Sequence, residues 1–163
     1  MGLVEISMRH AVTRAQLIVF ASLGSVAVLA GAFAFQAFGY APCHLCLLQR
    51  WPHAAAIAIG ALALALGWRL LPWLGALAAL TTAGLGLYHT GVERAWWEGP
   101  TTCTSGSVAG VDPKALLDQI LAAPIVRCDE VAWQMLGLSM ASWNVLVSLA
   151  LAFIWIAAAR KSP

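Results

Sequence analysis

The sequence predicts an all-α membrane protein: a bundle of four transmembrane helices with a long outer loop that carries a short interfacial helix. Of its 163 residues, 61% are hydrophobic and only 10% are charged, and the mean hydropathy is +0.82. A membrane-spanning helix needs about 20 mostly apolar residues, and four stretches qualify, at about 15–35, 47–66, 72–88 and 142–159. None alternates with the period of two that a barrel strand requires. We expect residues 1–163 to form a single membrane domain.

The first span has an alternative interpretation as a secretory signal peptide, because Ala32-Phe33-Ala34 resembles a cleavage site. Its apolar run is longer than the roughly 7–15 residues that are usual for the core of a signal peptide. We therefore expect a helix that is retained in the protein.

Charged residues between the spans indicate the orientation. Arg9 and Arg14 precede the first span, Arg69 separates the second from the third, and Arg160 and Lys161 follow the fourth. In a four-span protein these segments share one side, and the positive-inside rule places that side, with both termini, in the cytoplasm. The net charge of +2 gives no indication of nucleic-acid binding. Six of the seven acidic residues fall on the opposite side: Glu93, Glu98, Asp112, Asp118, Asp129 and Glu130.

The outer loop, from about 91 to 138, is too long for a simple turn. Trp96 and Trp97 are expected to anchor it at the level of the lipid headgroups. Asp112, followed by proline, has the pattern of a helix N-cap, and the helix that it begins should end near Pro124. That helix either lies flat on the membrane or packs on its own protein. The apolar residues along one of its sides are Leu116, Leu117, Ile120 and Leu121.

All four cysteines, Cys43, Cys46, Cys103 and Cys128, fall on the outer side of this topology. An even number of thiols outside the cytoplasm is typical of disulfide chemistry. Three pairings are possible, and the short spacing favours Cys43 with Cys46, which leaves Cys103 with Cys128. Closing the longer loop would stabilise the fold, whereas the small C-x-x-C ring offers little entropic gain. We therefore predict that the C-x-x-C pair is redox-active.

A metal site is another hypothesis for the C-x-x-C pair, because His44, His53 and His89 are available. Zinc sites usually combine such a pair with a second one or with an H-x-x-x-H motif, and the chain has neither. Leu47 follows Cys46 where a haem attachment motif requires histidine. We therefore expect no metal.

Cys46, Arg50 and His53 follow the spacing i, i+4, i+7 and so share one face of the second span. Arg50 lies about 6 Å of helix rise from Cys46. A charged side chain near the membrane is a functional candidate, and its alternative role is to snorkel to the headgroups. We expect Arg50 to stabilise negative charge on Cys46 and on an electron acceptor, with His89 as a hydrogen-bond donor to the same ligand. An apolar pocket that contains a cation suits a lipid-soluble quinone.

These features resemble the disulfide-bond formation protein B (DsbB) family of bacterial inner-membrane thiol:quinone oxidoreductases. The likeness extends over nearly the whole chain, and the order of the cysteines together with the spacing to Arg50 makes it specific. The matching segments are Phe35-Gln36, Pro42-Cys43-His44-Leu45-Cys46-Leu47-Leu48-Gln49-Arg50, Tyr88-His89, Cys103, Cys128, Trp133, Gly137-Leu138-Ser139-Met140 and Trp143.

The resemblance implies a relay of disulfide exchange on the periplasmic side of a bacterial inner membrane. Cys103 would form a mixed disulfide with DsbA, a soluble dithiol protein of the thioredoxin fold, and Cys128 would be the resolving thiol. Cys43 would then take the electrons from Cys128, and Cys46 would pass them to ubiquinone or menaquinone. The residues that would bind the quinone are Cys46, Arg50 and His89.

Two other functions are weighed against this one. Enzymes like vitamin K epoxide reductase also combine a four-helix bundle, two cysteine pairs and a quinone, but their loop pair precedes the C-x-x-C, in the reverse of the order found here. A non-enzymatic membrane scaffold with structural disulfides would require Cys43 and Cys46 to be inert and Arg50 to be dispensable.

Overall fold

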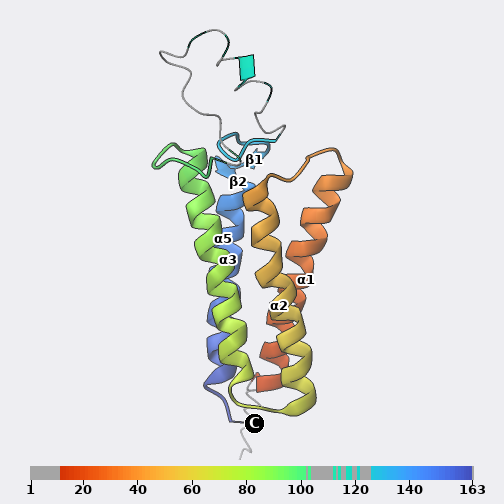
Figure 1. Ribbon diagram of the computed structural model, residues 1–163. Helices are drawn as coiled ribbons and strands as arrows, with labels where there is room; N and C mark the ends of the chain where they lie inside the picture. Colours follow the sequence, from red (N-terminus) through yellow and green to blue (C-terminus); the bar gives the residue numbers. More distant parts are fainter. Residues whose placement is uncertain are drawn as a thin grey trace, which may run out of the picture.

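The computed structural model describes residues 12–101 and 126–162, and between them residues 103, 112, 114, 117, 118 and 121. Four long helices dominate it and run alternately up and down (Figure 1). Each is long and apolar enough to cross a membrane, so the predicted four-helix membrane bundle is confirmed and the protein is a multi-pass membrane protein. The helices are α1 (Arg14–Ala37), α2 (His44–Leu66), α3 (Leu71–Glu93) and α5 (Met140–Ala159).

Local sequence signals explain where the helices begin and end. Thr13 caps α1 in a capping box with Gln16. Cys43 caps α2, because its sulfur accepts a hydrogen bond from the Cys46 backbone N–H at 3.2 Å. The other end of α2 is closed by Gly67, whose φ of 66° is the left-handed conformation that glycine adopts without strain. Ser139 caps α5 through the Ser142 backbone N–H.

All four helices extend beyond the limits expected from hydropathy, and the extensions of α2 and α3 bear on the cysteines and His89. Helix α2 begins at His44, so the C-x-x-C pair lies in and just before its first turn. Helix α3 continues one turn past 88, because its last turn is buried through Thr90, Gly91 and Val92. Polar and small residues lower the mean hydropathy, so the expected span ends before the helical hydrogen bonds do. His89 therefore lies within α3, one turn before its end.

Small residues let the helices approach closely in the core of the bundle. The indole of Trp155 in α5 is completely buried and lies directly against the backbone of Gly75 in α3 and near Gly60 in α2. Ile18 and Ala21 of α1 complete the same cluster. The bundle therefore depends on backbone contacts that a larger side chain at these glycines would disrupt.

A short antiparallel hairpin joins the outer loop to α5. Its strands are β1 (Gln134–Met135) and β2 (Leu138–Ser139), paired Gln134 with Ser139 and Met135 with Leu138. The turn between them uses positive φ at both Leu136 (53°) and Gly137 (75°), as expected for a two-residue hairpin. The sequence predicted a loop here as far as about residue 138, so the two strands are a difference from the expected structure.

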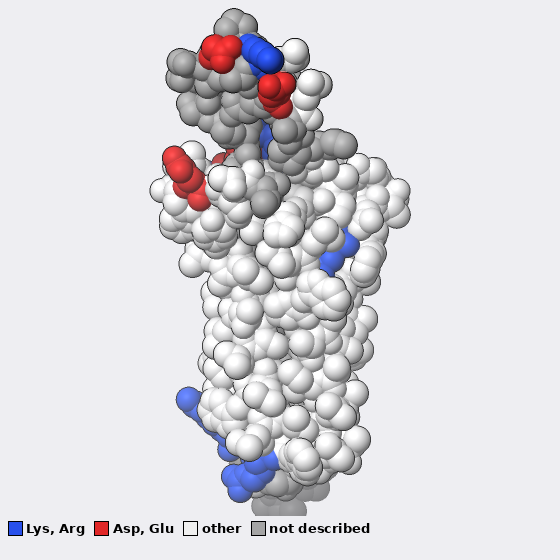
Figure 2. All heavy atoms as spheres, in the orientation of Figure 1, with Lys and Arg blue, Asp and Glu red and all other residues white. Residues whose placement is uncertain are grey.

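Charge is distributed unevenly along the bundle. On the face shown in Figure 2, the end opposite the loop carries basic side chains, the loop end carries acidic side chains together with some basic ones, and most of the length between them is uncharged. At the basic end, the Arg14 guanidinium donates to the carbonyls of Gly67 and Trp68, which ties α1 to the connection after α2. The basic residues at the end opposite the loop are those from which the orientation in the membrane was predicted.

Part of the outer loop matches its expected structure. The carboxylate of Asp112 accepts a hydrogen bond from the Lys114 backbone N–H at 2.9 Å, as a helix N-cap does. Lys114, Leu117, Asp118 and Leu121 are helical, and both leucines are exposed. The other residues named for this helix, and Arg9, lie outside the described residues. Trp97 stacks on Tyr88 and donates its indole N–H to the Tyr88 carbonyl; the anchoring role of Trp96 and Trp97 stays a prediction.

Candidate active site

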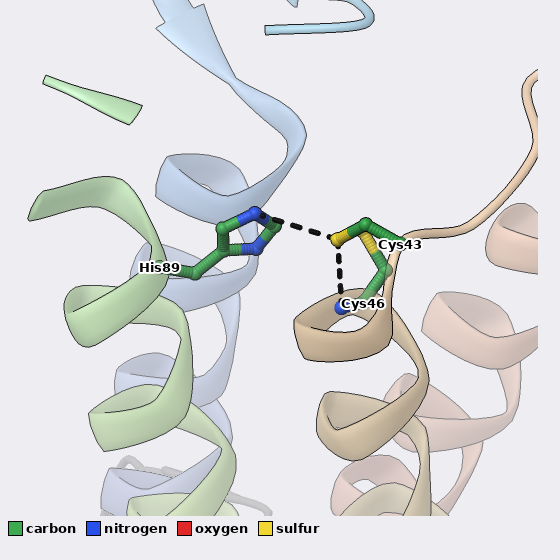
Figure 3. A group of neighbouring side chains, drawn as sticks. All are labelled: Cys43, Cys46 and His89. Atoms are coloured by element: carbon green, nitrogen blue, oxygen red, sulfur yellow. Dashed lines mark hydrogen bonds between the residues drawn. The ribbon is translucent and has the colours of Figure 1, made fainter. Parts of the chain in front are cut away.

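The C-x-x-C pair lies where α2 begins, at the loop end of the bundle. Cys43 and Cys46 are free thiols whose sulfur atoms are 2.8 Å apart, and only 4% of Cys43 is exposed (Figure 3). The hydrogen bond with the Cys46 sulfur, followed by burial, raises the pKa of the Cys43 thiol.

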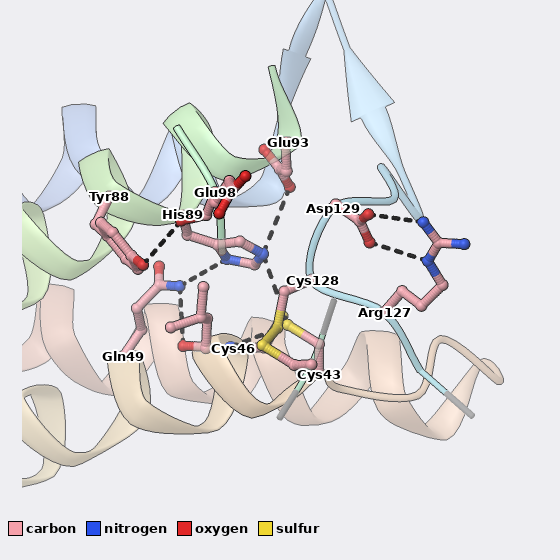
Figure 4. Close-up of a disulfide and its surroundings, with 12 residues drawn as sticks. Cys43, Cys46, Gln49, Tyr88, His89, Glu93, Glu98, Arg127, Cys128 and Asp129 are labelled. Carbon is pink, nitrogen blue, oxygen red and sulfur yellow. Dashed lines mark hydrogen bonds and ion pairs between the residues drawn. A yellow bond between two sulfur atoms is a disulfide. The ribbon is translucent and has the colours of Figure 1, made fainter. Parts of the chain in front are cut away.

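The second cysteine pair packs directly on the first. Cys103 and Cys128 form a disulfide with a Cα–Cα distance of 5.3 Å, and both are fully buried (Figure 4). They share a buried cluster with Cys43, Leu45 and Val92, against which Cys46 also packs. The four cysteines that the sequence predicted to act together are thus in one place, and Cys103 is joined to Cys128 as expected.

His89 reaches the cysteines from α3. Its Nε2 is 3.6 Å from the Cys43 sulfur and its Nδ1 is 3.0 Å from the amide nitrogen of Gln49 (Figure 4). The same Gln49 nitrogen donates to the Leu45 carbonyl at 3.1 Å, which identifies it as the NH₂ group. Nδ1 of His89 therefore accepts, and the proton of the neutral ring is on Nε2, facing Cys43. Glu93 lies 3.9 Å from the same nitrogen.

A pocket opens beside this cluster, between α1, α2 and α5. It has a volume of about 340 Å³ and walls that are mostly apolar, including Phe35, Trp133 and Trp143. This volume lies at the lower end of the range for small-molecule sites. The polar side chains that line it are Cys46, Gln49, Arg50, His53, His89 and Asn144. The pocket thus brings together all three residues that the sequence assigned to cofactor binding.

Arg50 is half-buried and is held against α1. Its guanidinium donates to the Gln36 side chain at 2.9 Å and to the Ala32 carbonyl at 3.4 Å, and it lies over the Phe33 ring at 4.8 Å. A side chain that only snorkelled would have its guanidinium free in the headgroup region. These contacts instead fix a cation at the wall of the pocket, on the face of α2 that carries Cys46.

A buried polar network that was not predicted from the sequence lies beneath the cysteines. Asn144 of α5 donates from Nδ2 to the Gln49 side-chain oxygen at 2.8 Å, and its Oδ1 is 3.0 Å from Nε2 of His53. At the loop end, the Ser139 hydroxyl donates to the Glu93 carboxylate. An amide in an apolar span is costly unless it is paired, so the position of Asn144 inside such a span already indicates a buried polar partner.

The structure brings one of the histidines considered as a metal ligand, His89, close to the C-x-x-C pair. The ligating atoms of Cys43, Cys46 and His89 all lie within 4.8 Å of one another. The hydrogen bond from Gln49, however, places the His89 proton on Nε2, the nitrogen that faces the sulfurs. This tautomer presents its N–H to the Cys43 sulfur and does not ligate a metal through that atom. The absence of a metal stays a prediction.

Close to Cys128, the loop carries an ion pair. The Arg127 guanidinium makes two hydrogen bonds to the Asp129 carboxylate, at 3.0 and 2.7 Å. These bonds hold the pKa of Asp129 below its usual value, and burial opposes the shift. Glu130 lies 3.4 Å from the same guanidinium. The ion pair therefore links the two residues that flank Cys128.

The bundle has four membrane spans and packs a dithiol against a disulfide of the outer loop. This arrangement is typical of a membrane protein that takes part in disulfide exchange. The family model described as "Disulfide bond formation protein DsbB" matches residues 14–158. The chain therefore belongs to the DsbB family, whose activity is the oxidoreductase chemistry of disulfide formation. The match therefore favours the DsbB family over the alternative, an enzyme like vitamin K epoxide reductase.

Two curated relatives match most of the chain. The chain is 30% identical over 156 residues to a protein named "Disulfide bond formation protein B" from Albidiferax ferrireducens, a match that covers 87% of this chain and 88% of that protein. It is also 27% identical over 140 residues to an uncharacterized protein of Rickettsia prowazekii. That match covers 82% of this chain and 80% of the Rickettsia protein. No solved structure matches the chain significantly.

Proposed function

We propose that this protein is a dithiol:quinone oxidoreductase that reoxidises a periplasmic dithiol protein of the thioredoxin fold, similar to DsbA. It lies in a bacterial inner membrane as a single domain, with both termini in the cytoplasm and all four cysteines on the periplasmic side. The observation that carries the proposal is the position of the C-x-x-C pair. It contacts the loop disulfide on one side, and Cys46 lines an apolar pocket with a fixed cation on the other.

The exchange begins at the loop disulfide. A thiolate of the partner attacks the Cys103 sulfur, so that the Cys103–Cys128 bond breaks and Cys128 leaves as a thiolate. Cys128 then attacks Cys43 of the oxidised Cys43–Cys46 pair, and Cys46 leaves as a thiolate.

The partner is released by two further exchanges. Its second thiolate displaces Cys103, which completes the partner's own disulfide. Cys103 then attacks Cys128, which restores the loop disulfide and frees Cys43. The net result is that two electrons have moved from the partner to the C-x-x-C pair. His89, with its proton on Nε2 toward Cys43, stabilises negative charge on that sulfur as it departs.

The pocket suits a quinone ring, either ubiquinone or menaquinone. Its walls are apolar, its volume is about 340 Å³, and polar groups reach it from α2, α3 and α5. When bound, a quinone accepts two electrons and two protons from the reduced pair. Cys46, Arg50 and His89 would hold it, with the Arg50 cation stabilising negative charge on Cys46 and in the pocket.

The proposal is tested by mixing purified protein with a reduced thioredoxin-fold dithiol and a short-chain ubiquinone, and following the quinone absorbance. The wild type is expected to turn over. Cys46→Ser is expected to stop quinone reduction, although its loop disulfide still oxidises about one equivalent of partner. No turnover by the wild type, or full turnover by Cys46→Ser, would refute the oxidase and favour the scaffold.

A further inference from the structure

Glu93, the last residue of α3, is a buried acidic group to which the mechanism assigns no role. Its side chain is only 6% exposed. The Ser139 hydroxyl donates to Oε2, and Oε1 lies 3.9 Å from Nε2 of His89 (Figure 4). The neighbouring Arg94 turns away, and its guanidinium lies over the Trp96 ring at 5.8 Å. Among the described residues, no lysine or arginine forms an ion pair with Glu93. An ionised carboxylate is costly to bury without a basic partner, so this carboxyl is suited to hold a proton.

A small cavity connects Glu93 with the C-x-x-C pair. It has a volume of about 40 Å³, which is enough for a water molecule. Arg127 is half-buried and Glu130 is exposed, so the cavity extends to the surface of the loop. It therefore offers protons a path between that surface and the cysteines. The titratable and charged residues that line it, from α2, α3 and the loop, are Cys43, Cys46, His89, Glu93, Arg127 and Glu130.

The exchange of disulfides requires a proton at Cys43. When Cys103 attacks Cys128, the Cys43 sulfur is freed as a thiolate. Cys46 has already left as a thiolate, and the two sulfur atoms are 2.8 Å apart. Two negative charges at this distance in a buried site repel each other strongly. The hydrogen bond between the two sulfurs of the reduced pair itself needs at least one proton. A proton must therefore reach the pair as Cys43 is freed.

His89 is close to Cys43 but is not the source of this proton. Its Nδ1 already accepts a hydrogen bond from Gln49, so the neutral ring has only the proton on Nε2. Loss of that proton would leave the ring as an anion. His89 can therefore stabilise the freed sulfur with its N–H, 3.6 Å away, but cannot protonate it. Glu93 is the next group that can carry a proton, 3.9 Å from the same nitrogen.

We propose that Glu93 is the general acid of the C-x-x-C centre and protonates the Cys43 sulfur through a water molecule in the small cavity. This inference rests on the exchange steps of the proposed function. In the last exchange, the Cys43–Cys128 bond breaks while the Cys103–Cys128 bond forms. The proton of the Glu93 carboxyl passes to the Cys43 sulfur, and a carboxylate remains. The Ser139 hydroxyl stabilises this carboxylate until a proton from the loop surface restores the acid.

The step is isolated by reducing oxidised, quinone-free protein with dithiothreitol, at concentrations where the internal exchange limits the rate. Acid quenching, alkylation and mass spectrometry of peptides then follow the appearance of the free Cys43 thiol. In the wild type, the rate should rise with pH as the attacking thiols ionise and fall again as Glu93 loses its proton. In Glu93→Gln, which keeps an acceptor for Ser139, the rate is expected to be about a hundredfold lower and the falling limb to be absent. Glu98→Gln, at an exposed glutamate near the same end, is the control and should match the wild type.

A second measurement needs no substitution. In the infrared spectrum of the oxidised wild type at neutral pH, we expect the carbonyl stretch of a protonated carboxyl, and carbon-13 labelling of glutamate should shift it. A wild-type profile without a falling limb, equal rates in Glu93→Gln and Glu98→Gln, or no band from a protonated glutamate would each overturn the proposal. None of these readouts uses quinone or the partner. A chain that shows the profile and the band but does not reduce quinone would refute the proposed function alone.

Discussion

Gln49 donates its amide hydrogen to Nδ1 of His89 across 3.0 Å, which joins α2 to α3 one turn from the redox pair. The oxygen of the same amide accepts from Asn144, so α5 is tied to the same point. One buried side chain therefore connects three of the four helices and determines the protonation pattern of His89. The amide acts on Cys43 through the histidine, as a positioning group.

Replacement of Gln49 by leucine should disorder this arrangement. Without the amide donor, neutral His89 can carry its proton on either nitrogen, and its alignment with Cys43 is lost. We expect dithiol-dependent quinone reduction to fall about tenfold, because one buried hydrogen bond and its unpaired partner are involved. Nitrogen-15 spectra of the histidine ring should show the tautomers mixing. Gln134→Leu, at an exposed glutamine in β1, is the control and should change neither measurement.

Arg50→Ala should affect quinone use more than Arg69→Ala. Arg50 is fixed at the pocket by Gln36 and Ala32, whereas Arg69 is exposed in the connection between α2 and α3, at the other end of the bundle. Hydrogen bonds to charged groups are worth about 1.5–3 kcal/mol. We therefore expect kcat/KM for quinone to fall roughly ten- to hundredfold in Arg50→Ala and to change less than twofold in Arg69→Ala.

The two arginine variants should oxidise the first equivalent of partner equally fast, since that step uses only the loop disulfide. Stopped-flow measurement of that first exchange, alongside steady-state turnover, separates the two effects. Equal losses of quinone turnover in both variants would show that Arg50 only anchors its helix.

The spans and the grouping of the cysteines could be predicted from sequence because their signals are local. Hydropathy over 18 or so residues identifies a span, and the spacing from Cys46 to Arg50 and His53 defines one helical face. The short spacing of Cys43 and Cys46 left Cys103 to pair with Cys128, and the structure confirms that disulfide. Helix limits were less accurate, because hydropathy does not report where hydrogen bonding stops.

The polar network could not be predicted in the same way. Gln49 meets His89 across 40 residues of sequence and Asn144 across 95, so no local period brings these partners together. Arg50 likewise finds Gln36 only after α1 and α2 pack side by side. The hairpin escaped notice because strands of two residues are too short to show alternation. The sequence contains only a weaker indication of the network, namely the amide side chains of Gln49 and Asn144 inside apolar spans.

The Arg127–Asp129 pair predicts how the loop responds to acid. Because Arg127 depresses the pKa of Asp129, the carboxylate stays charged below the usual midpoint near 3.9. The stabilisation from this pair is present above that midpoint and is lost as pH falls through the lower pKa of the folded state. Carbon-13 titration of the carboxyl should show a depressed midpoint, which Arg127→Gln returns toward the normal value and Arg160→Gln does not change. A midpoint at the normal value in the wild type would contradict the pairing.

Gly75 and Gly84 lie on the same helix and should respond oppositely to alanine. A Cβ on Gly75 would come within 2.5 Å of the buried Trp155 ring, whereas a Cβ on Gly84 meets nothing within 4 Å. A rigid indole cannot yield, so α3 and α5 must separate. Overpacking of this kind costs about 1–3 kcal/mol, and we expect Gly75→Ala to lower the unfolding midpoint in detergent accordingly. Gly84→Ala should leave it unchanged or raise it, since alanine favours the helix by up to about 1 kcal/mol. Equal midpoints for the two variants would mean that contact between Gly75 and Trp155 does not hold the bundle together.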